Sequence, residues 1–562
     1  MDLKKNSESS GEEEITIFRN KFLPNFKMIS FMDFTNFTQL VKFTKDSFEN
    51  AVLLREIIFP PNVNTIDGFK NCSNLVSLDF SNCLHLERFE KHAFERGFSL
   101  REINFPPNLK MVSGFKICTS LVSLDFSNCL HLEKFDKFAF STAISLQEII
   151  FPANIKTIDG FYWCTSLVSL DFSNYSQLEK LDGFYMNLSL KNIVFPPNVK
   201  IIFGFNYCTS LVSLNFSNCL KLENFVSNAF ENTFALQDII FPTNVKSIDG
   251  FAYCTSLTSL DLSNYLQLEK ILYCSFNYAW SLQNILFPPN VKIICGFDNC
   301  TRLVSLDFSN CSELEVLDGF NKEISLQNIT FPPNLKKIGE FNHCTSLVSI
   351  NLSNCLQLEK IENFAFFNAW SLQTIQFAPN LKTITGFNIC TSLVSLDFSS
   401  CNQLEIFETT IFFNAWSLCS IQFPPNLKII QNCAFKNSSR LTSLQIPASV
   451  EIIEENSFNS CEQLEQVTFE GPTILGEGAF DNCPRLVGLV YLQNRYVDCV
   501  FGKYSELKQS NRFDITKCVI TQEEFKDDSD IIILRCGHPF FKEALEIWTK
   551  KHWSCPACKQ RI

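Results

Sequence analysis

The chain has 562 residues, more than one compact domain usually holds unless a structural unit repeats along it. Hydrophobic residues make up 46% of the sequence, so the chain can bury a core, and its 59 Phe residues indicate one structural role used many times. The formal net charge of −12 argues against a nucleic-acid scaffold, whose binding surface should be basic.

The N-terminal residues and the cysteines indicate in which cellular compartment the protein is expected. Residues 1–27 are expected to form an acidic, disordered segment, and they lack the apolar stretch of a signal peptide. No run of about 18 apolar residues predicts a membrane span. Most of the 25 cysteines recur at fixed repeat positions, so we expect reduced thiols in an intracellular protein, cytoplasmic or nuclear, rather than secreted disulfides.

The segment from residue 28 to residue 490 repeats a short pattern. The line LREIIFPPNVNTIDGF begins at Leu54, and related lines restart every 46 or 44 residues as far as Leu418. Sister lines such as LVSLDFSNCLHLEKF lie between them. Each unit opens with L-x-x-I/L-x-F, an alternation that predicts a short strand, and turns at Phe-Pro-Pro-Asn or Phe-Ser-Asn-Cys. The pattern predicts about 20 units in a right-handed solenoid with a parallel sheet on one face.

These units closely resemble the BspA-like leucine-rich repeat, as the line LTSLQIPASVEIIEENSFNSCEQ from Leu441 illustrates. The resemblance covers roughly residues 29 to 490. It implies an α/β repeat solenoid with a parallel sheet on its concave face.

Most cysteines and many phenylalanines occupy fixed positions in the units. We expect both to fill the core. A metal ladder is disfavoured because Tyr175 and Tyr265 replace Cys at the second cysteine position. The first position holds Cys72, Cys118, Cys164, Cys208, Cys254, Cys300, Cys344 and Cys390, the second holds Cys83, Cys129, Cys219, Cys311, Cys355 and Cys401, and Phe59, Phe80 and Phe94 represent the phenylalanines.

One strand position should face solvent on the concave side. In alternate units it is acidic, and in the units between it is often apolar, as at Ile58 and Ile150. Two interpretations stay open: a surface that binds a basic, partly apolar protein substrate, or a solvated stripe copied with each duplication. The acidic residues are Asp79, Asp125, Asp171, Asp261, Asp307 and Asp397.

The segment from residue 516 to residue 562 carries a different pattern. Cys536 and His538 form a C-x-H pair, and Cys555 and Cys558 form a C-x2-C pair further on. Thiolate sulfur and imidazole nitrogen are ligands that zinc takes in tetrahedral structural sites. The spacing therefore predicts that these four residues can bind one Zn²⁺ ion.

This segment resembles RING and U-box domains, which implies a small α+β domain after a cap and linker at residues 491–515. A RING finger holds two zinc ions with two interleaved sets of ligands. The second set matches the four residues above, whereas only Cys518 remains of the first. Thr521, Phe541 and Ala544 stand at its other three positions and cannot bind zinc. The resemblance thus implies one zinc ion, with hydrophobic packing in place of the second.

The resemblance also implies a partner. In RING and U-box ligases a hydrophobic groove binds the ubiquitin-conjugating enzyme, and the domain orients the charged thioester without a covalent step of its own. No catalytic residue is therefore expected. The matching positions in this sequence are Val519, Ile520, Trp548, Pro556 and Lys559.

The two parts together predict a ubiquitin ligase in which the repeats bind a protein substrate and the finger recruits a conjugating enzyme. Two alternatives stay open. One is a non-enzymatic interaction scaffold with a structural zinc cap, and the other is a SUMO ligase, which the one-zinc pattern resembles. Neither a nucleic acid nor a membrane is expected as a partner.

Overall fold

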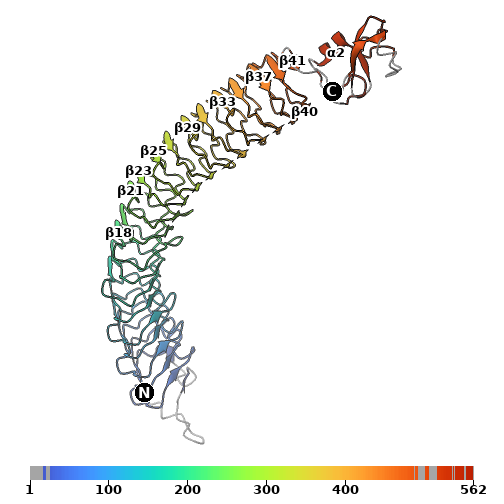
Figure 1. Cartoon of the computed structure of the whole chain (residues 1–562). Helices are drawn as coiled ribbons and strands as arrows, with labels where there is room; N and C mark the ends of the chain where they lie inside the picture. Colours follow the sequence, from blue (N-terminus) through green and yellow to red (C-terminus); the bar gives the residue numbers. More distant parts are fainter. Residues whose placement is uncertain are drawn as a thin grey trace. The chain divides into compact units, whose positions relative to one another are not determined.

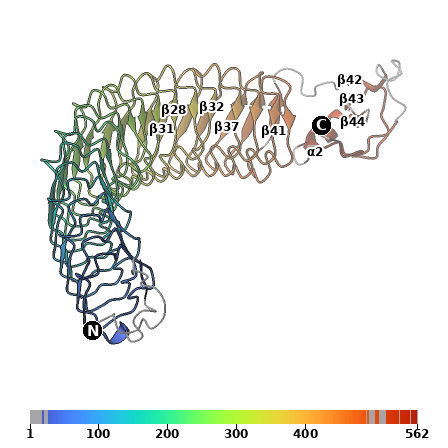
Figure 2. The same cartoon turned by 90° about the horizontal axis from the view of Figure 1, so that it is seen from below.

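The structure is a computed structural model that describes residues 17–19, 26–486, 488–491, 500–505, 516–534, 536, 538–549, 552 and 554–560. The chain divides into two compact units, unit 1 (residues 1–303) and unit 2 (residues 304–562). Figures 1 and 2 show that similar turns follow one another in chain order within each unit, and that unit 2 also contains a C-terminal domain with helix α2 (Lys542–Thr549).

Most turns of unit 1 contain one strand of three residues and one of two, and a 3-10 helix, η3 (Phe26–Met28), lies near the start. In the turn that begins at Ser213, an isolated bridge from Asn224 to Ser247 takes the place of the two-residue strand. The three-residue strands are β2 (Phe31–Asp33), β4 (Glu56–Ile58), β6 (Ser77–Asp79), β8 (Glu102–Asn104), β10 (Ser123–Asp125), β12 (Glu148–Ile150), β14 (Ser169–Asp171), β16 (Asn192–Val194), β18 (Ser213–Asn215), β19 (Asp238–Ile240), β21 (Ser259–Asp261) and β23 (Asn284–Leu286). The two-residue strands are β1 (Ile17–Phe18), β3 (Lys42–Phe43), β5 (Thr65–Ile66), β7 (Arg88–Phe89), β9 (Met111–Val112), β11 (Lys134–Phe135), β13 (Thr157–Ile158), β15 (Lys180–Leu181), β17 (Ile201–Ile202), β20 (Ser247–Ile248), β22 (Lys270–Ile271) and β24 (Ile293–Ile294).

The turns of unit 2 follow the same plan, with longer first strands near the end. The first strands are β25 (Ser305–Asp307), β27 (Asn328–Thr330), β29 (Ser349–Asn351), β31 (Thr374–Gln376), β33 (Ser395–Asp397), β35 (Ser420–Gln422), β37 (Ser443–Ile446), β39 (Gln466–Phe469) and β41 (Gly488–Tyr491). The second strands are β26 (Val316–Leu317), β28 (Lys337–Ile338), β30 (Lys360–Ile361), β32 (Thr383–Ile384), β34 (Ile406–Phe407), β36 (Ile429–Ile430), β38 (Ile452–Ile453) and β40 (Ile474–Leu475).

All strand pairs within the turns are parallel and keep one register. In unit 1 the second strands β1 to β17 form one nine-stranded sheet. The first strands pair in twos, as where Asp125 of β10 lies opposite Ile150 of β12. The middle residue of a first strand points inward and its neighbours are exposed, as the alternating sequence predicts. The turns form a parallel β-solenoid of about 20 turns with little helix, which refines the α/β class expected from the family resemblance.

A column of Phe rings runs through the core of each unit. In unit 1 the rings of Phe48, Phe69, Phe94 and Phe115 lie nearly parallel, with centroids 5.1 to 5.2 Å apart. Similar stacks continue in unit 2, where the rings of Phe435 and Phe458 lie 5.1 Å apart. Stacked rings bury much apolar area in each turn, so the phenylalanines are confirmed as core residues.

The repeated cysteines are buried thiols that bond to the backbone of the preceding turn. The Sγ of Cys72 donates to the carbonyl oxygen of Phe48 at 3.2 Å, and the Sγ of Cys129 donates to that of Pro106 at 3.5 Å. Burial raises the pKa of both thiols to about 12, which leaves them protonated and unreactive. At the second cysteine position the Tyr175 hydroxyl instead accepts from the Phe151 amide at 3.2 Å. These contacts support the packing interpretation over a metal ladder.

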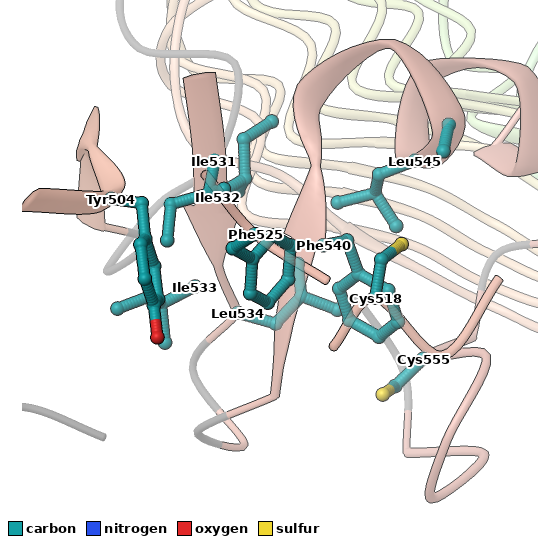
Figure 3. Close-up of a cluster of buried hydrophobic side chains, with 11 residues drawn as sticks. Tyr504, Cys518, Phe525, Ile531, Ile532, Ile533, Leu534, Phe540, Leu545 and Cys555 are labelled. Carbon is teal, nitrogen blue, oxygen red and sulfur yellow. The ribbon is translucent and has the colours of Figure 1, made fainter. Parts of the chain in front are cut away.

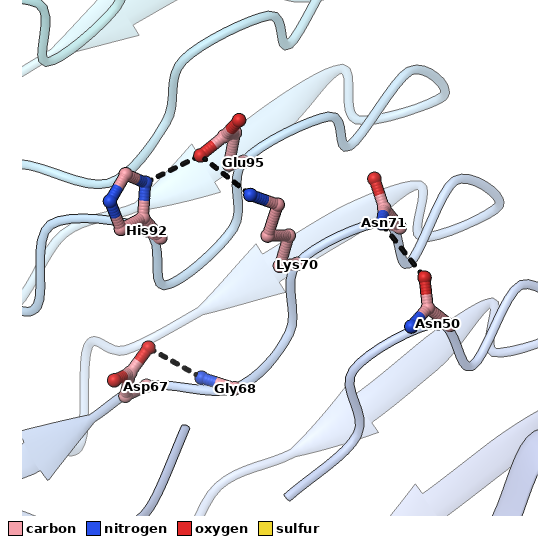
Figure 4. Close-up of polar contacts among 7 residues, drawn as sticks. All are labelled: Asn50, Asp67, Gly68, Lys70, Asn71, His92 and Glu95. Atoms are coloured by element: carbon pink, nitrogen blue, oxygen red, sulfur yellow. Dashed lines mark hydrogen bonds and ion pairs between the residues drawn. The ribbon is translucent and has the colours of Figure 1, made fainter. Parts of the chain in front are cut away.

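Polar side chains join each turn to its neighbour. The Asn of Phe-Pro-Pro-Asn donates to a carbonyl oxygen one turn earlier, as where the Nδ2 of Asn108 lies 2.8 Å from the oxygen of Leu84. Lysines one turn after glutamates form a ladder of surface ion pairs, such as Lys110 with Glu87 at 2.7 Å. Figure 4 shows a third kind of contact, in which the Nδ2 of Asn71 donates to the Oδ1 of Asn50 at 2.8 Å.

The limits of the solenoid differ from those expected. Strand β1 lies within the segment expected to be disordered, and it pairs with β3, so the repeats begin upstream of residue 28. Residues 1–16 and 20–25 lie outside the described residues. At the other end β41 pairs with β39 and extends the repeat pairing to Tyr491.

The C-terminal domain is a three-stranded antiparallel sheet followed by α2. Its strands are β42 (Val500–Lys503), β43 (Asp530–Ile533) and β44 (Pro539–Phe541). Strand β42 lies inside the expected linker 491–515 and pairs with β43, so the domain begins before residue 516. Within the described parts of the chain, no helix has both the length and the apolar character needed to cross a membrane.

Candidate metal centre

The C-terminal domain brings four side chains together as one possible metal site. Cys536 and His538 lie in the connection between β43 and β44, and Cys555 and Cys558 lie in the loop after α2. The ligand atoms of these four residues all lie within 4.8 Å of one another, and no other such group occurs among the described residues. Two thiols on one loop and a thiol with an imidazole on another can hold a tetrahedral metal ion.

Backbone hydrogen bonds fix both loops. The Leu534 amide donates to the His538 carbonyl oxygen at 3.0 Å, which closes the first loop. In the second loop, the Lys559 amide donates to the carbonyl oxygen of Cys555 at 2.9 Å. Burial raises the pKa of Cys536 to about 12, whereas the Gln560 backbone lowers that of Cys558. A divalent cation would stabilise the thiolate forms of all three cysteines.

The positions of the other RING ligand set are packed as a hydrophobic core. Cys518 is 0% exposed, Ala544 is buried, and the Phe541 ring meets the Phe525 ring edge-on at a centroid distance of 4.9 Å. Figure 3 shows Cys518 and Phe525 among the buried side chains of the sheet and helix. Thr521 is exposed. Cys518, Phe541 and Ala544 therefore take part in apolar packing, whereas Thr521 faces solvent.

The residues expected to bind a conjugating enzyme fall into two groups. Val519 and Ile520 are half-buried in a turn and pack against the hydrophobic core. Pro556 is half-buried in the second metal loop. The side chains of Trp548 and Lys559 meet, with the Lys559 Nζ 5.0 Å from the indole centroid.

Trp548 connects the helix to the second metal loop. Its Nε1 donates to the Ser554 carbonyl oxygen at 2.9 Å, and its ring lies 4.4 Å from that of the exposed His552. The adjacent Ile547 is 66% exposed on α2 and was missed from the sequence. An apolar residue on the outer face of an amphipathic helix was the available signal.

The acidic residues of the first strands have a local structural role. The Oδ1 of Asp125 accepts a hydrogen bond from the Ser127 amide at 2.8 Å, and the other five make the same turn. Asn215 accepts the same bond from the Ser217 amide at 2.9 Å, so the turn needs the oxygen and not the charge. Hydrogen bonds from Ser173 lower the pKa of Asp171. These carboxylates are exposed to solvent.

The solenoid and the metal loops define a repeat protein with a RING-type zinc domain at its C-terminal end. Matches to the BspA type leucine rich repeat region occur in six copies, at residues 16–114, 112–203, 181–304, 269–387, 317–440 and 385–497. The chain therefore belongs to the BspA-type leucine-rich repeat family. Residues 516–559 match the Ring finger domain.

Characterised relatives match only the C-terminal domain. The chain is 31% identical over 61 residues to the E3 ubiquitin-protein ligase Godzilla of Drosophila melanogaster, covering 11% of each protein. It is 32% identical over 57 residues to the E3 ubiquitin-protein ligase AIRP1 of Arabidopsis thaliana, which is 10% of this chain and 37% of that protein. A leucine-rich repeat protein from Bacteroides ovatus is similar over 64% of this chain and 82% of its own, at 21% identity and a TM-score of 0.43.

Proposed function

We propose that the chain is a ubiquitin ligase whose C-terminal domain binds one zinc ion and recruits a charged ubiquitin-conjugating enzyme. The observation that carries the proposal is the four-ligand group inside a segment that matches the Ring finger domain and two E3 ligases. The domain would act by positioning the thioester for attack by a substrate lysine. Because conjugating enzymes work inside cells, the proposal places the chain there, in accord with its many free thiols.

The proposed zinc count follows from the packing around the missing ligands. A second ion would need ligands at Thr521, Phe541 and Ala544, and none of these side chains can supply one. The Phe541 ring and the buried thiol of Cys518 belong to the hydrophobic core instead. U-box domains, which the segment also resembles, are held without metal, so apolar packing at one site is compatible with ligase activity.

The proposed surface for the conjugating enzyme includes Ile547, Trp548, Pro556 and Lys559, together with Val519 and Ile520 of the first loop. Ile547 is exposed, and the stacked Trp548 and Lys559 present an apolar ring beside a cation. Such a mixed surface suits a partner that offers both apolar and acidic groups. The repeats would then bind the protein substrate.

The test uses the full chain with purified activating enzyme, a broad panel of conjugating enzymes, ubiquitin and ATP. We expect autoubiquitination and one zinc ion per chain by mass spectrometry of metals. Ile547→Ala should reduce transfer and keep the zinc, whereas Cys555→Ser should lose both. Thr521→Ala is the matched control, because its exposed side chain should affect neither.

The outcomes separate the proposal from its alternatives. A zinc-loaded chain that transfers no ubiquitin with any conjugating enzyme would refute the ligase proposal. Transfer of SUMO in parallel reactions, without transfer of ubiquitin, would assign the chain to SUMO ligases. Two zinc ions per chain would refute the one-zinc site while leaving the ligase proposal standing.

A further inference from the structure

An edge of unit 1 carries tyrosines that the core does not use. We call the surface formed by Tyr207, Tyr253 and Tyr278 the tyrosine edge. Each of these tyrosines lies two residues after a Phe of the stacked column. All three side chains are partly exposed. Tyr207 meets Tyr185 of the turn before at a centroid distance of 5.6 Å, and Tyr253 stacks on Tyr278 at 4.3 Å.

The backbone at this position disfavours large side chains. Tyr207, Tyr253 and Tyr278 have φ angles of 60°, 61° and 62°, which lie in the left-handed region. Asn tolerates this region best after Gly, and Asn71 and Asn437 occupy the same position elsewhere, with φ of 61° and 67°. Tyrosine therefore adds conformational strain without filling the core. The same backbone angle occurs at Ile117, with φ of 64°, and at Ile389, with φ of 62°, so the position accepts other side chains and does not itself require a tyrosine.

The Asn residues at this position show what the fold itself requires. The Nδ2 of Asn71 donates to the Oδ1 of Asn50 in the preceding turn, as Figure 4 shows, and the Nδ2 of Asn437 lies 2.7 Å from the Oδ1 of Asn414. These bonds tie neighbouring turns together. On the tyrosine edge, contacts between aromatic rings stand where the Asn hydrogen bonds would be. These turns therefore lack the Asn–Asn bond and present aromatic side chains at the surface instead.

The surroundings of the tyrosine edge are acidic. The Tyr207 amide donates to the Glu231 carbonyl oxygen at 2.8 Å, which places Glu231 in the neighbouring turn. Burial, Tyr278 and then Glu231 raise the pKa of Tyr253. Burial and the carboxylates of Asp249, Glu231 and Asp298 likewise raise the pKa of the nearby Cys274. The side chains next to the rings thus contribute negative charge.

Lysines of the chain itself show that rings in this part of the solenoid accept ammonium groups. The Nζ of Lys180 lies over the Phe203 ring at 4.8 Å, and those of Lys116 and Lys137 lie over Phe138 at 5.6 and 5.5 Å. Among the described residues, the tyrosine edge carries no lysine of this kind. Ring faces and carboxylates both attract cations, so the edge is complementary to a positive partner.

We propose that the tyrosine edge binds an extended segment of a protein partner that is rich in lysine or arginine, with the ring faces contacting the cations and Glu231 pairing with one of them. A neutral sugar chain would use the rings but would gain nothing from the carboxylates. The proposal concerns binding alone and holds whether or not the chain transfers ubiquitin.

The test measures binding of a fluorescent twelve-residue peptide of alternating lysine and glycine to the full chain by anisotropy. The test variant is the triple substitution Tyr207→Asn, Tyr253→Asn and Tyr278→Asn, which keeps a residue that suits the left-handed backbone. We expect it to weaken binding at least about five-fold, because three cation–π contacts are removed. Glu231→Gln should weaken binding less and reduce its salt dependence.

The matched control is Ile389→Asn, which changes the same position of a turn in unit 2, where φ is 62°. It should leave binding unchanged. The proposal is refuted if the triple variant binds like the wild type, or if a glutamate–glycine peptide binds as well as the lysine peptide. It is also refuted if cellohexaose binds the edge and the lysine peptide does not.

Discussion

The substitution Phe541→Ala tests whether apolar packing has replaced the second metal site of the finger. The Phe541 ring is half-buried and meets Phe525 edge-on at 4.9 Å. Loss of about 100 Å² of buried apolar surface costs about 2.5 kcal/mol, at about 25 cal/mol per Å². The lost ring pair adds about 0.5–1.5 kcal/mol. A domain of this size loses roughly 4–8 °C in Tm per kcal/mol, so the combined loss of about 3–4 kcal/mol should lower the unfolding transition of the finger by about 12–32 °C.

Calorimetry of the full chain would follow that transition, and metal analysis would count zinc in the same samples. The count should be one per chain in the wild type and in Phe541→Ala, because the substitution removes packing and no ligand. Thr521→Ala is the control: it stands at another lost ligand position, but its side chain is exposed, so its Tm should stay unchanged. A wild-type count of two, or an unchanged Tm in Phe541→Ala, would contradict the reasoning.

Two further predictions concern the solenoid. Asp182 is buried, and burial together with the nearby Asp159 raises its pKa from 3.8 to about 6. Its ionisation opposes folding, so stability should fall as the pH rises from about 4 to 6 and stay low above 6. Asp182→Asn should therefore stabilise the chain by about 1–3 kcal/mol at pH 7.5 and change little at pH 4, and urea unfolding with no gain at pH 7.5 would contradict this. Asp125→Ala should cost about 1 kcal/mol by removing the acceptor for the Ser127 amide, whereas Asp125→Asn should be neutral, and equal urea midpoints for the two variants would count against the turn role.

Much of the fold could be predicted from the repeat pattern, because each turn of the solenoid packs against neighbouring turns of nearly the same sequence. The alternation in L-x-x-I/L-x-F placed the first strands, and the recurrence of Cys and Phe identified them as core residues. The sequence did not predict the two-residue strands of the other face, since two residues show no periodicity. It also placed the start of the solenoid at residue 28, downstream of β1, because β1 is set by its pairing with β3 and not by a repeated motif.

In the finger, the residues that could hold a metal ion were predictable, because their spacing along the chain is typical of zinc ligands. Cys536, His538, Cys555 and Cys558 were identified as one set from C-x-H and C-x2-C, and the structure brings their ligand atoms together. Strand β42 could not be found in this way, because only its antiparallel pairing with β43 assigns it to the domain. Ile547 was missed because the sequence of a short helix does not show which of its apolar residues are buried and which are exposed.

By itself the sequence determined the family, the repeat and the group of four Cys and His residues that could hold a metal ion, because each depends on residue types at fixed spacing. Only the tertiary structure decided which contacts and backbone angles each single side chain has. For the Asp residues of the first strands, spacing left a binding surface and a solvated stripe open, and the structure adds that their oxygens accept hydrogen bonds in turns that Asn serves equally well. The fold placed Tyr207, Tyr253 and Tyr278 at left-handed backbone positions, and the Tyr207 amide donates to the Glu231 carbonyl oxygen of the next turn. Hydrogen bonds and backbone angles are set by contacts between turns, which spacing along the chain does not record.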